Sequence, residues 1–296
     1  MPETGSRQSS RDSYCLTCSD DDLKAVAQTI RESILTTVSN AGVGHPGGSL
    51  SAVEILTTLY FSELRIDPAR PDWQTRDRFI LSKGHASSAL YATLAERGFI
   101  SPDLLTTFGK INSLLQVHPD MHKVPGVEIS TGALGLGLSV GVGMALAAKQ
   151  DYPDKPGEPG VRVYVLLGDG ECQEGVVWEA AMAASHYKLD NLVAIVDYNQ
   201  VQLYGPVSKI MEIAPLADKW RSFGWAVHET QGHDIDALRS CFNEVRKIKG
   251  RPSVIIAHTV KGKGVSFMEG KAAWHGRPPK HEELKDALEE VRTCNQ

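Results

Sequence analysis

The sequence predicts an α/β protein with a doubly wound, mainly parallel sheet and helices on both faces. Two segments, residues 163–167 and 192–196, are apolar at every position, and a helical stretch at 174–188 separates them. Strands with no polar face belong to parallel sheets that are covered on both sides, and strand-helix-strand units close with right-handed crossovers. The pattern continues with strands at 225–230 and 253–258 and a helix at 234–249 between them, so one α/β domain is expected.

The domain is expected to begin with an amphipathic helix. Residues 1–19 are rich in Ser, Arg, Gln and Thr, which predicts a disordered N-terminal extension. Asp20, Asp21 and Asp22 suit a helix N-terminus, and apolar residues recur at helical spacing from Leu23 to Val38. We therefore place the folded domain at residues 20–296.

Further elements are expected between and after these segments. Residues 49–64 are predicted as one helix, residues 78–81 form a short apolar run, and another helix follows up to Gly98. The stretch 132–143 contains five glycines, but no strand precedes it and it lacks the dinucleotide-binding spacing, so it predicts close helix packing. A surface loop is expected at 152–160, and a charged helix at 282–292.

Composition excludes several functional classes. The chain has 296 residues and a formal net charge of -5 with both signs interspersed, so neither nucleic acid nor a membrane surface is an expected partner. No apolar run is long enough to span a bilayer, and residues 1–22 lack the apolar core of a secretory signal. A cytoplasmic protein is expected. Cys15 and Cys18 form a lone C-x-x-C pair without further ligands nearby, which indicates a chance pair.

The candidate chemistry lies where the two apolar strands end. Gly168-Asp169-Gly170-Glu171 follows the first strand, and Asn199 comes shortly after the second. Ligands of open α/β sheets bind beyond the carboxyl ends of strands, so Asp169 and Asn199 are expected in one crevice. A carboxylate and an amide oxygen suit Mg²⁺, and the glycines allow phosphates to approach the backbone. Gly-Asp-Gly by itself is an ordinary turn; its place between two buried strands gives it weight.

The segment from Gly168 to Asn199 resembles the cofactor motif of thiamine-diphosphate-dependent enzymes. Further motifs occur in the order typical of the transketolase family and extend the resemblance over residues 22–279. They are Gly44-His45-Pro46-Gly47-Gly48, Ser82-Lys83-Gly84-His85-Ala86, His118-Pro119, Thr131-Gly132-Ala133-Leu134-Gly135, Lys261-Gly262-Lys263-Gly264 and Trp274-His275-Gly276. The resemblance implies the thiamine-diphosphate-binding fold, with this chain as its diphosphate-binding (PP-type) domain.

The resemblance also implies a role for each matching residue. Mg²⁺, for which Ca²⁺ or Mn²⁺ can substitute, would be bound by Asp169, Asn199 and the carbonyl of Val201. The catalytic set would be His45, His275, His118 and Glu174, in which His45 and His275 meet the reacting oxygens and His118 meets the C1 hydroxyl of the donor sugar. Thiamine diphosphate would contact His85, Gly132, Leu134, Gly168, Asp169, Gly170, Glu171, Asn199, Lys261 and His275.

One position departs from the family pattern, and two acids have more than one interpretation. Transketolases usually have Gly where this chain has Val117, and a β-branched residue does not easily adopt positive φ, so a differently shaped loop at His118 is one expectation. Glu174 and Glu179 are either ordinary helix charges or acids of a subunit interface. The remaining histidines are expected on the surface with no role in catalysis: His122, His186, His228, His233, His258 and His281.

Transketolases continue beyond the Trp-His-Gly motif into two more domains, and this sequence has only a charged helix there. The resemblance therefore predicts one subunit of a split transketolase that transfers a two-carbon ketol unit between sugar phosphates. A second subunit, in an α2β2 assembly, would supply the pyrimidine-binding and C-terminal domains; a truncated chain is the other possibility. Two rival functions are the α-subunit of a 2-oxo acid dehydrogenase, which the histidine set disfavours, and a non-catalytic cofactor-binding paralogue.

Overall fold

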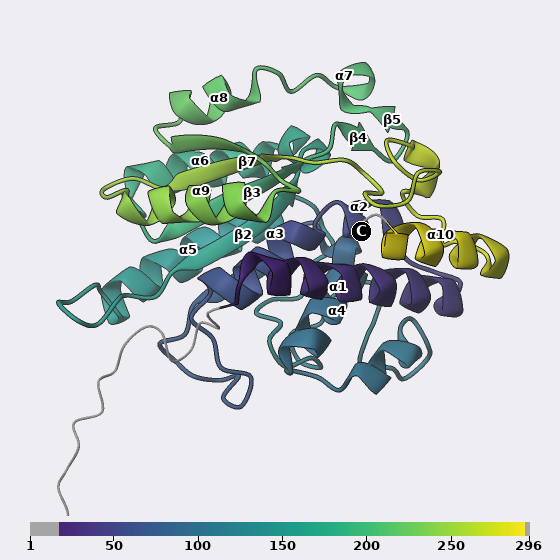
Figure 1. Cartoon of the computed structure of the whole chain (residues 1–296). Helices are drawn as coiled ribbons and strands as arrows, with labels where there is room; N and C mark the ends of the chain where they lie inside the picture. The colour runs from purple at the N-terminus through teal and green to yellow at the C-terminus, as the bar shows by residue number, and fades with distance from the viewer. Residues whose placement is uncertain (1–17, 294–296) are drawn as a thin grey trace, which may run out of the picture.

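The computed structural model describes residues 18–293, which form a three-layer α/β domain (Figure 1). Of the predicted extension at residues 1–19, all but Cys18 and Ser19 lies outside the described residues. Ser19 is the N-cap of the first helix, and it exchanges hydrogen bonds with Asp22 in a capping box. This cap satisfies two backbone donors at the helix start and fixes where the folded domain begins.

Five parallel strands form the central sheet in the order β1-β2-β3-β7-β6. The predicted parallel sheet is thus confirmed, and a separate antiparallel hairpin, β4 with β5, follows β3. The strands are β1 (Arg78–Leu81), β2 (Val163–Gly168), β3 (Leu192–Tyr198), β4 (Val201–Gln202), β5 (Gly205–Pro206), β6 (Ala226–Gln231) and β7 (Ser253–His258).

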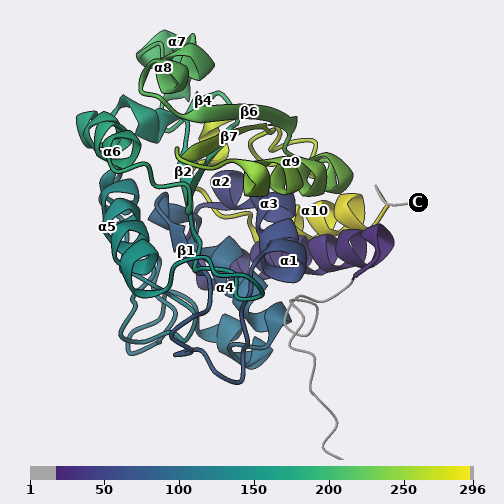
Figure 2. The same cartoon turned by 90° about the vertical axis from the view of Figure 1, so that its left-hand side faces the viewer.

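Helices cover both faces of the sheet, as predicted (Figure 2). One face packs with α1, α3, α4 and α9, and the opposite face packs with α5, α6 and α8. The helices are α1 (Asp20–Ala41), α2 (Pro46–Leu50), α3 (Val53–Thr58), α4 (Ser87–Arg97), α5 (Leu136–Asp151), α6 (Gly175–His186), α7 (Val207–Ile210), α8 (Leu216–Ser222), α9 (Ile235–Lys247) and α10 (His281–Thr293). None of the described helices is long and apolar enough to cross a membrane.

The apolar strands explain why the sheet is covered twice. Along β2, Tyr164 and Leu166 belong to one core cluster, whereas Val163, Val165 and Leu167 belong to the other. Successive side chains of a strand point to opposite faces. A strand that is apolar at every position must therefore be buried on both sides.

The stretch predicted as helical at 49–64 is largely helical, but it is not one continuous α-helix. The chain forms α2, then α3, and ends in a π-helical turn, η2 (Leu59–Glu63). The first break falls at Ser51, whose hydroxyl donates to the carbonyl of Gly48 at 3.2 Å and to the carboxylate of Asp197 at 2.6 Å. Apolar periodicity predicted the buried face but not this polar contact with a distant strand.

Helix α5 approaches the sheet closely because of its glycines, as the sequence indicated. A Cβ at Gly141 would lie 2.6 Å from Cγ2 of Val165 on β2. By contrast, a Cβ at Gly143 would meet nothing within 4 Å. Gly137, at the start of the helix, is also required by packing, because a Cβ there would lie 2.5 Å from Cβ of Ser82, whereas Gly143 is not required.

We predict opposite effects for alanine at Gly141 and at Gly143. Gly141→Ala should destabilise the fold by about 1–3 kcal/mol, because the new methyl group overpacks the contact with Val165. Gly143→Ala should stabilise it by about 0.5–1 kcal/mol, because alanine loses less backbone entropy in a helix. Denaturant unfolding of both variants measures this, and equal effects would contradict the packing role of Gly141.

Candidate functional site

The candidate site lies beyond the carboxyl ends of three neighbouring strands. Asp169 follows β2, Asn199 follows β3 and Lys261 follows β7, which is the edge where open α/β sheets bind ligands. A pocket of about 320 Å³ opens there. Its lining includes these predicted residues: His85, Leu134, Gly168, Asp169, Gly170, Glu171, Glu174, Asn199, Val201, Lys261 and His275.

The three predicted metal ligands lie together on the loops after β2 and β3. Both oxygens of Asp169 accept backbone N–H groups, one from Gly170 at 2.7 Å and the other from Gln200. Oδ1 of Asn199 accepts the N–H of Val201 at 3.1 Å. Carboxylate and amide oxygens can each accept more than one such interaction, so these bonds orient the oxygens without using up their capacity.

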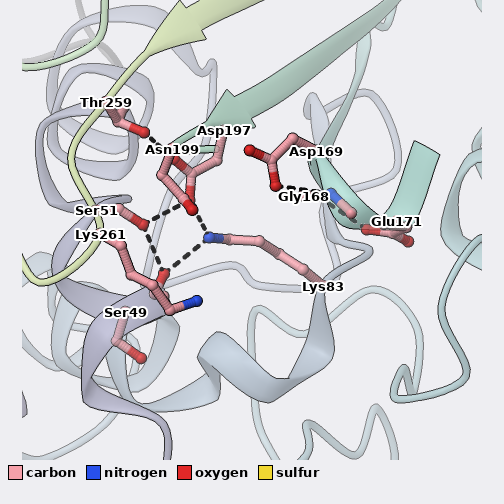
Figure 3. A network of polar contacts seen from close by, with 12 residues as sticks. Ser49, Ser51, Lys83, Gly168, Asp169, Glu171, Asp197, Asn199, Thr259 and Lys261 are labelled. Carbon is pink, nitrogen blue, oxygen red and sulfur yellow. Dashed lines mark hydrogen bonds and ion pairs between the residues drawn. The ribbon is translucent and has the colours of Figure 1, made fainter. Parts of the chain in front are cut away.

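A buried ion pair between Lys83 and Asp197 lies beneath these loops (Figure 3). Lys83 Nζ also donates to the Gly48 carbonyl at 2.8 Å. The Asp197 carboxylate accepts from Ser51 at 2.6 Å and from the hydroxyl of Thr259. Burial opposes ionisation of Asp197, but the Lys83 ammonium and these hydroxyls hold its pKa below the usual value.

Asn199 is tied to the same carboxylate, because its Nδ2 donates to Asp197 Oδ2 at 3.2 Å. This contact fixes which end of the Asn199 amide faces the pocket. Because Nδ2 donates to Asp197, the amide oxygen of Asn199 is the atom left to face the pocket. The ion pair thus orients a predicted ligand.

Glu171 acts as a clamp between three segments of the site. Its buried carboxylate accepts the N–H of Gly168 at 3.0 Å, the N–H of Gly135 at 2.7 Å and the hydroxyl of Ser82. The sequence predicted a cofactor contact for Glu171. The structure shows its carboxylate bonded to the protein, with the residue at the pocket wall.

Four predicted histidines form a cluster at one side of the pocket. The ring centroid of His45 lies 5.3 Å from that of His85, 5.4 Å from that of His275 and 6.1 Å from that of His118. The rings of His85 and His275 are 5.0 Å apart. The structure therefore brings together four loops that lie far apart in the sequence.

Three of these histidines, His45, His85 and His275, are held neutral. Burial lowers the pKa of His275 to about 3, and the nearby Lys261 ammonium adds to this effect. Burial also lowers the pKa of His85 and of His45. Lys261 Nζ lies 3.1 Å from His275 Nδ1, and an ammonium only donates, so the neutral His275 ring carries its proton on Nε2.

Burial also shifts the titratable groups beside the predicted metal ligands toward their uncharged forms. Burial and the neighbouring Asp197 carboxylate raise the pKa of Asp169 to about 6. Burial lowers the pKa of Lys261 to about 8, with the Lys83 ammonium contributing. Lys261 Nζ donates to the carbonyl of Val201 at 2.9 Å, so its charge faces the predicted metal ligands.

The remaining predicted residues lie at the pocket rim. Glu174 is exposed and precedes α6, and a Cβ at Gly135 would come within 2.9 Å of its Cβ. Gly132 lies against the ring of His118, which a Cβ there would meet at 3.2 Å. His118 keeps its place in the histidine cluster although Val117 precedes it. The carbonyl of Val117 accepts the Ser87 hydroxyl at 2.6 Å, which anchors this loop.

Sequence reasoning missed both members of the central ion pair. Lys83 lies in one of the motifs and Asp197 directly follows the second apolar strand, but nothing marked them as partners across the sheet. The surface placement of His233 and His228 is also wrong, because both rings are half-buried. Adjacent Gly232 and Asp234 resemble an ordinary turn, which explains the surface prediction for His233.

Residues 23–292 match the family described as "Transketolase, thiamine diphosphate binding domain". The chain is 45% identical over 269 residues to an apulose-4-phosphate transketolase subunit of Phocaeicola vulgatus, and the match covers 91% of this chain and 93% of that relative. It is 44% identical over 270 residues to the 6-deoxy-6-sulfo-D-fructose transketolase subunit SqwG of a Clostridium species, covering 91% and 96% respectively.

Longer transketolases match over part of their length. Human transketolase is 40% identical over 269 residues, which are 91% of this chain and 42% of the human protein. The crystal structure of the Pichia stipitis enzyme with sedoheptulose 7-phosphate matches with a TM-score of 0.87 and 32% identity, over 91% of this chain and 40% of that one. This chain thus spans about two fifths of these longer proteins.

We predict that Asp197→Ala destabilises the fold by about 3–5 kcal/mol, because it leaves the Lys83 ammonium buried without a counter-charge. Adding Lys83→Met removes that charge, so the double variant should lose less stability than the sum of the two single variants. Denaturant unfolding of the three variants measures the coupling. Additive losses would show that the pair does not act as a unit.

We predict that His275 contributes a loss of stability to the unliganded chain as the pH falls below about 6.5, so that His275→Gln makes the unfolding free energy less sensitive to acid than in wild type. The unfolded chain binds a proton at His275 near its ordinary pKa of 6.5, whereas the folded chain, with a pKa of about 3, does not. Each such histidine contributes at most about 1.4 kcal/mol per pH unit, less here because solvent screens a partly exposed ring. Urea unfolding between about pH 7.5 and pH 5 measures the slope; identical slopes in both chains would contradict the prediction.

Proposed function

This chain belongs to the transketolase family, and on that premise we propose that it is the diphosphate-binding subunit of a two-chain transketolase. It would transfer a two-carbon ketol unit from a ketose phosphate, or a similar polyol, to an aldose acceptor. The observation that carries the proposal is a pocket lined by His85 and His275 together with Asp169 and Asn199, with the rings of His45 and His118 clustered beside these two histidines. Relatives of similar length are named as transketolase subunits.

The residues of the pocket fit thiamine diphosphate with a divalent metal. Nδ1 of His45, beside the pocket-lining His85 and His275, is buried without a hydrogen-bond partner among the described residues, so the histidine cluster has a polar atom that a ligand could bind. Gly48 forms part of a cradle, since a Cβ there would lie 3.2 Å from Nε2 of His85. The oxygen set of Asp169, Asn199 and the Val201 carbonyl suits Mg²⁺, with Ca²⁺ or Mn²⁺ as substitutes.

Bound thiamine diphosphate supplies the cleavage and formation of the carbon–carbon bond next to a carbonyl. This chain holds the metal through Asp169, Asn199 and Val201 and contacts the diphosphate through His85 and Lys261. A lysine ammonium acts on phosphate as a point charge. Glu171 acts indirectly in this proposal, by holding the Gly168 and Gly135 backbone in place.

The histidines would donate hydrogen bonds to the sugar hydroxyls or accept hydrogen bonds from them. Because His275 is neutral with its proton on Nε2, it can donate a hydrogen bond to a substrate oxygen, while Lys261 holds its other nitrogen. His45 lies between His275 and His118 and can accept or donate at the next oxygen. His118, at the exposed end of the cluster, is assigned to the C1 hydroxyl of the donor.

A second subunit would complete the site. Large apolar side chains are exposed around the pocket mouth, among them Tyr204 at 83%, Leu203 at 47% and Leu134 at 38%. Exposed apolar groups around a polar pocket are typical of an interaction surface. We propose that the partner carries the pyrimidine-binding and C-terminal domains in an α2β2 assembly, with Glu174 at the interface. The cytoplasmic location expected from the sequence stays a prediction.

The α-subunit of a 2-oxo acid dehydrogenase was the nearest alternative. Such a protein shares the metal motif, whereas the four-histidine cluster suits a donor with several hydroxyl groups. The family match also supports a transketolase. The identity of the ketose and aldose depends on residues outside this pocket.

We predict that the purified chain with thiamine diphosphate and Mg²⁺ does not turn over a ketose donor, and that adding its co-purifying partner restores transfer to an aldose. The reason is that the described pocket offers the proposed metal and diphosphate contacts, whereas the pyrimidine-binding domain is assigned to the partner. A coupled assay with xylulose 5-phosphate and pyruvate as alternative donors measures this. Turnover by the chain alone would exclude the split site, and turnover of pyruvate in place of the ketose would favour the dehydrogenase.

A further inference from the structure

We infer that His233 is a positioning residue for Lys261, and that it acts by fastening the backbone on the N-terminal side of Lys261 to a buried Arg31–Glu54 ion pair. This inference rests on the proposed function for the role of Lys261 at the diphosphate. It adds a residue that lies outside the pocket and that the sequence placed on the surface.

His233 connects the loop of Lys261 to two helices. Its Nε2 accepts the backbone N–H of Val260 at 2.8 Å, and its Nδ1 lies 2.8 Å from Oε2 of Glu54 on α3. The other oxygen of Glu54 pairs with Arg31 on α1. Arg31 and Glu54 are 8% and 7% exposed. The three side chains thus form a continuous polar link from two packed helices to the residue before Lys261.

The two hydrogen bonds of His233 determine its tautomer. A backbone N–H can only donate, so Nε2 must be the unprotonated nitrogen, and the neutral ring then carries its proton on Nδ1. That proton is donated to Glu54. Burial alone would raise the pKa of Glu54, but Arg31 and His233 together hold it below its usual value, so the acceptor is ionised.

The backbone on both sides of Lys261 is hydrogen-bonded to this set of side chains, Arg31, Glu54 and His233. His233 holds the N–H of Val260, while Nε of Arg31 donates to the carbonyl of Lys263 at 3.2 Å. Between them, the N–H of Gly262 donates to Gly47, next to the histidine cluster, at 2.9 Å. Gly262 has φ of 78°, a conformation that glycine adopts without strain. A segment with such a residue needs outside contacts to keep one geometry.

The buried Arg31–Glu54 ion pair is better explained by its effect on the position of Lys261 than by a contribution to stability. Burying Arg31 and Glu54 removes both charges from water, and apolar residues of similar size are often as stabilising. Polar partners behind a functional residue instead fix its orientation. Lys261 needs that accuracy, since its Nζ lies within 3.1 Å of both the Val201 carbonyl and His275.

The test is a calorimetric titration of the full chain with inorganic diphosphate at saturating Mg²⁺, which requires only the diphosphate part of the pocket. His233→Ala should weaken binding about 10-fold, in the range seen when a supporting contact is lost. His233→Gln places an amide oxygen near the Nε2 position and should stay within about 3-fold of wild type, whereas His233→Asn reaches only the Nδ1 position and should resemble alanine.

A double-mutant cycle separates positioning from a general effect on folding. If His233 acts through Lys261, adding His233→Ala to Lys261→Met should weaken binding no further. His258→Ala is the control, because this imidazole also pairs with a glutamate, Glu229 at 3.1 Å, near the same loop, but its side chain is 37% exposed against 17% for His233; wild-type affinity is expected.

Additive losses in the cycle, or equal affinity for the Gln and Asn variants, would overturn the role of His233 while leaving the proposed function in place. A wild-type chain that does not bind magnesium diphosphate would instead remove the diphosphate assignment of Lys261, and the inference with it. Thermal unfolding of each variant identifies any loss of affinity that follows from loss of fold.

Discussion

The site depends on one buried ion pair, Lys83 with Asp197. Lys83 follows β1 and Asp197 lies in β3, so the pair crosses under the end of the intervening strand β2. Two buried charges are tolerated only when each has further partners, and here these come from the Gly48 carbonyl and the hydroxyls of Ser51 and Thr259. Satisfying this pair therefore sets the relative position of β1, β3, β7 and the α2–α3 break.

The two members of this pair shift the pKa values of different residues of the pocket. Asp197 adds to burial in raising the pKa of Asp169, so the metal side is poised to receive a cation. Lys83 and Lys261 add to burial in lowering the pKa of His275, so the histidine side remains neutral. Neutral imidazoles can both donate and accept hydrogen bonds, which suits a substrate with several hydroxyl groups. One ion pair thereby lies behind both the proposed metal site and the proposed sugar site.

Polar links to the helices extend this organisation away from the pocket. Glu171 joins the ends of β1 and β2 to the loop before α5. On the opposite face of the sheet, the Arg31–Glu54 pair reaches the loop of Lys261 through His233. Catalytic loops have few apolar contacts of their own, so their geometry must come from polar contacts with rigid elements. Tyr204 at the rim is 83% exposed, in keeping with the proposal that a partner completes this surface.

The sequence by itself determined the fold class, the strands of the central sheet, most of the helices that cover it, and the loops that carry the candidate site. Those features follow from local patterns: fully apolar strands, helical periodicity, and Asp169 or Asn199 directly after a strand. The tertiary structure decided which polar groups meet. Lys83 and Asp197 are 114 residues apart, and Glu54 and His233 are 179 apart, so no local pattern marks them as partners. The break in the helical stretch at Ser51 and the burial of His233 could not be predicted for the same reason. Each is imposed by a charge or hydroxyl that must find its partner once distant strands and helices have packed.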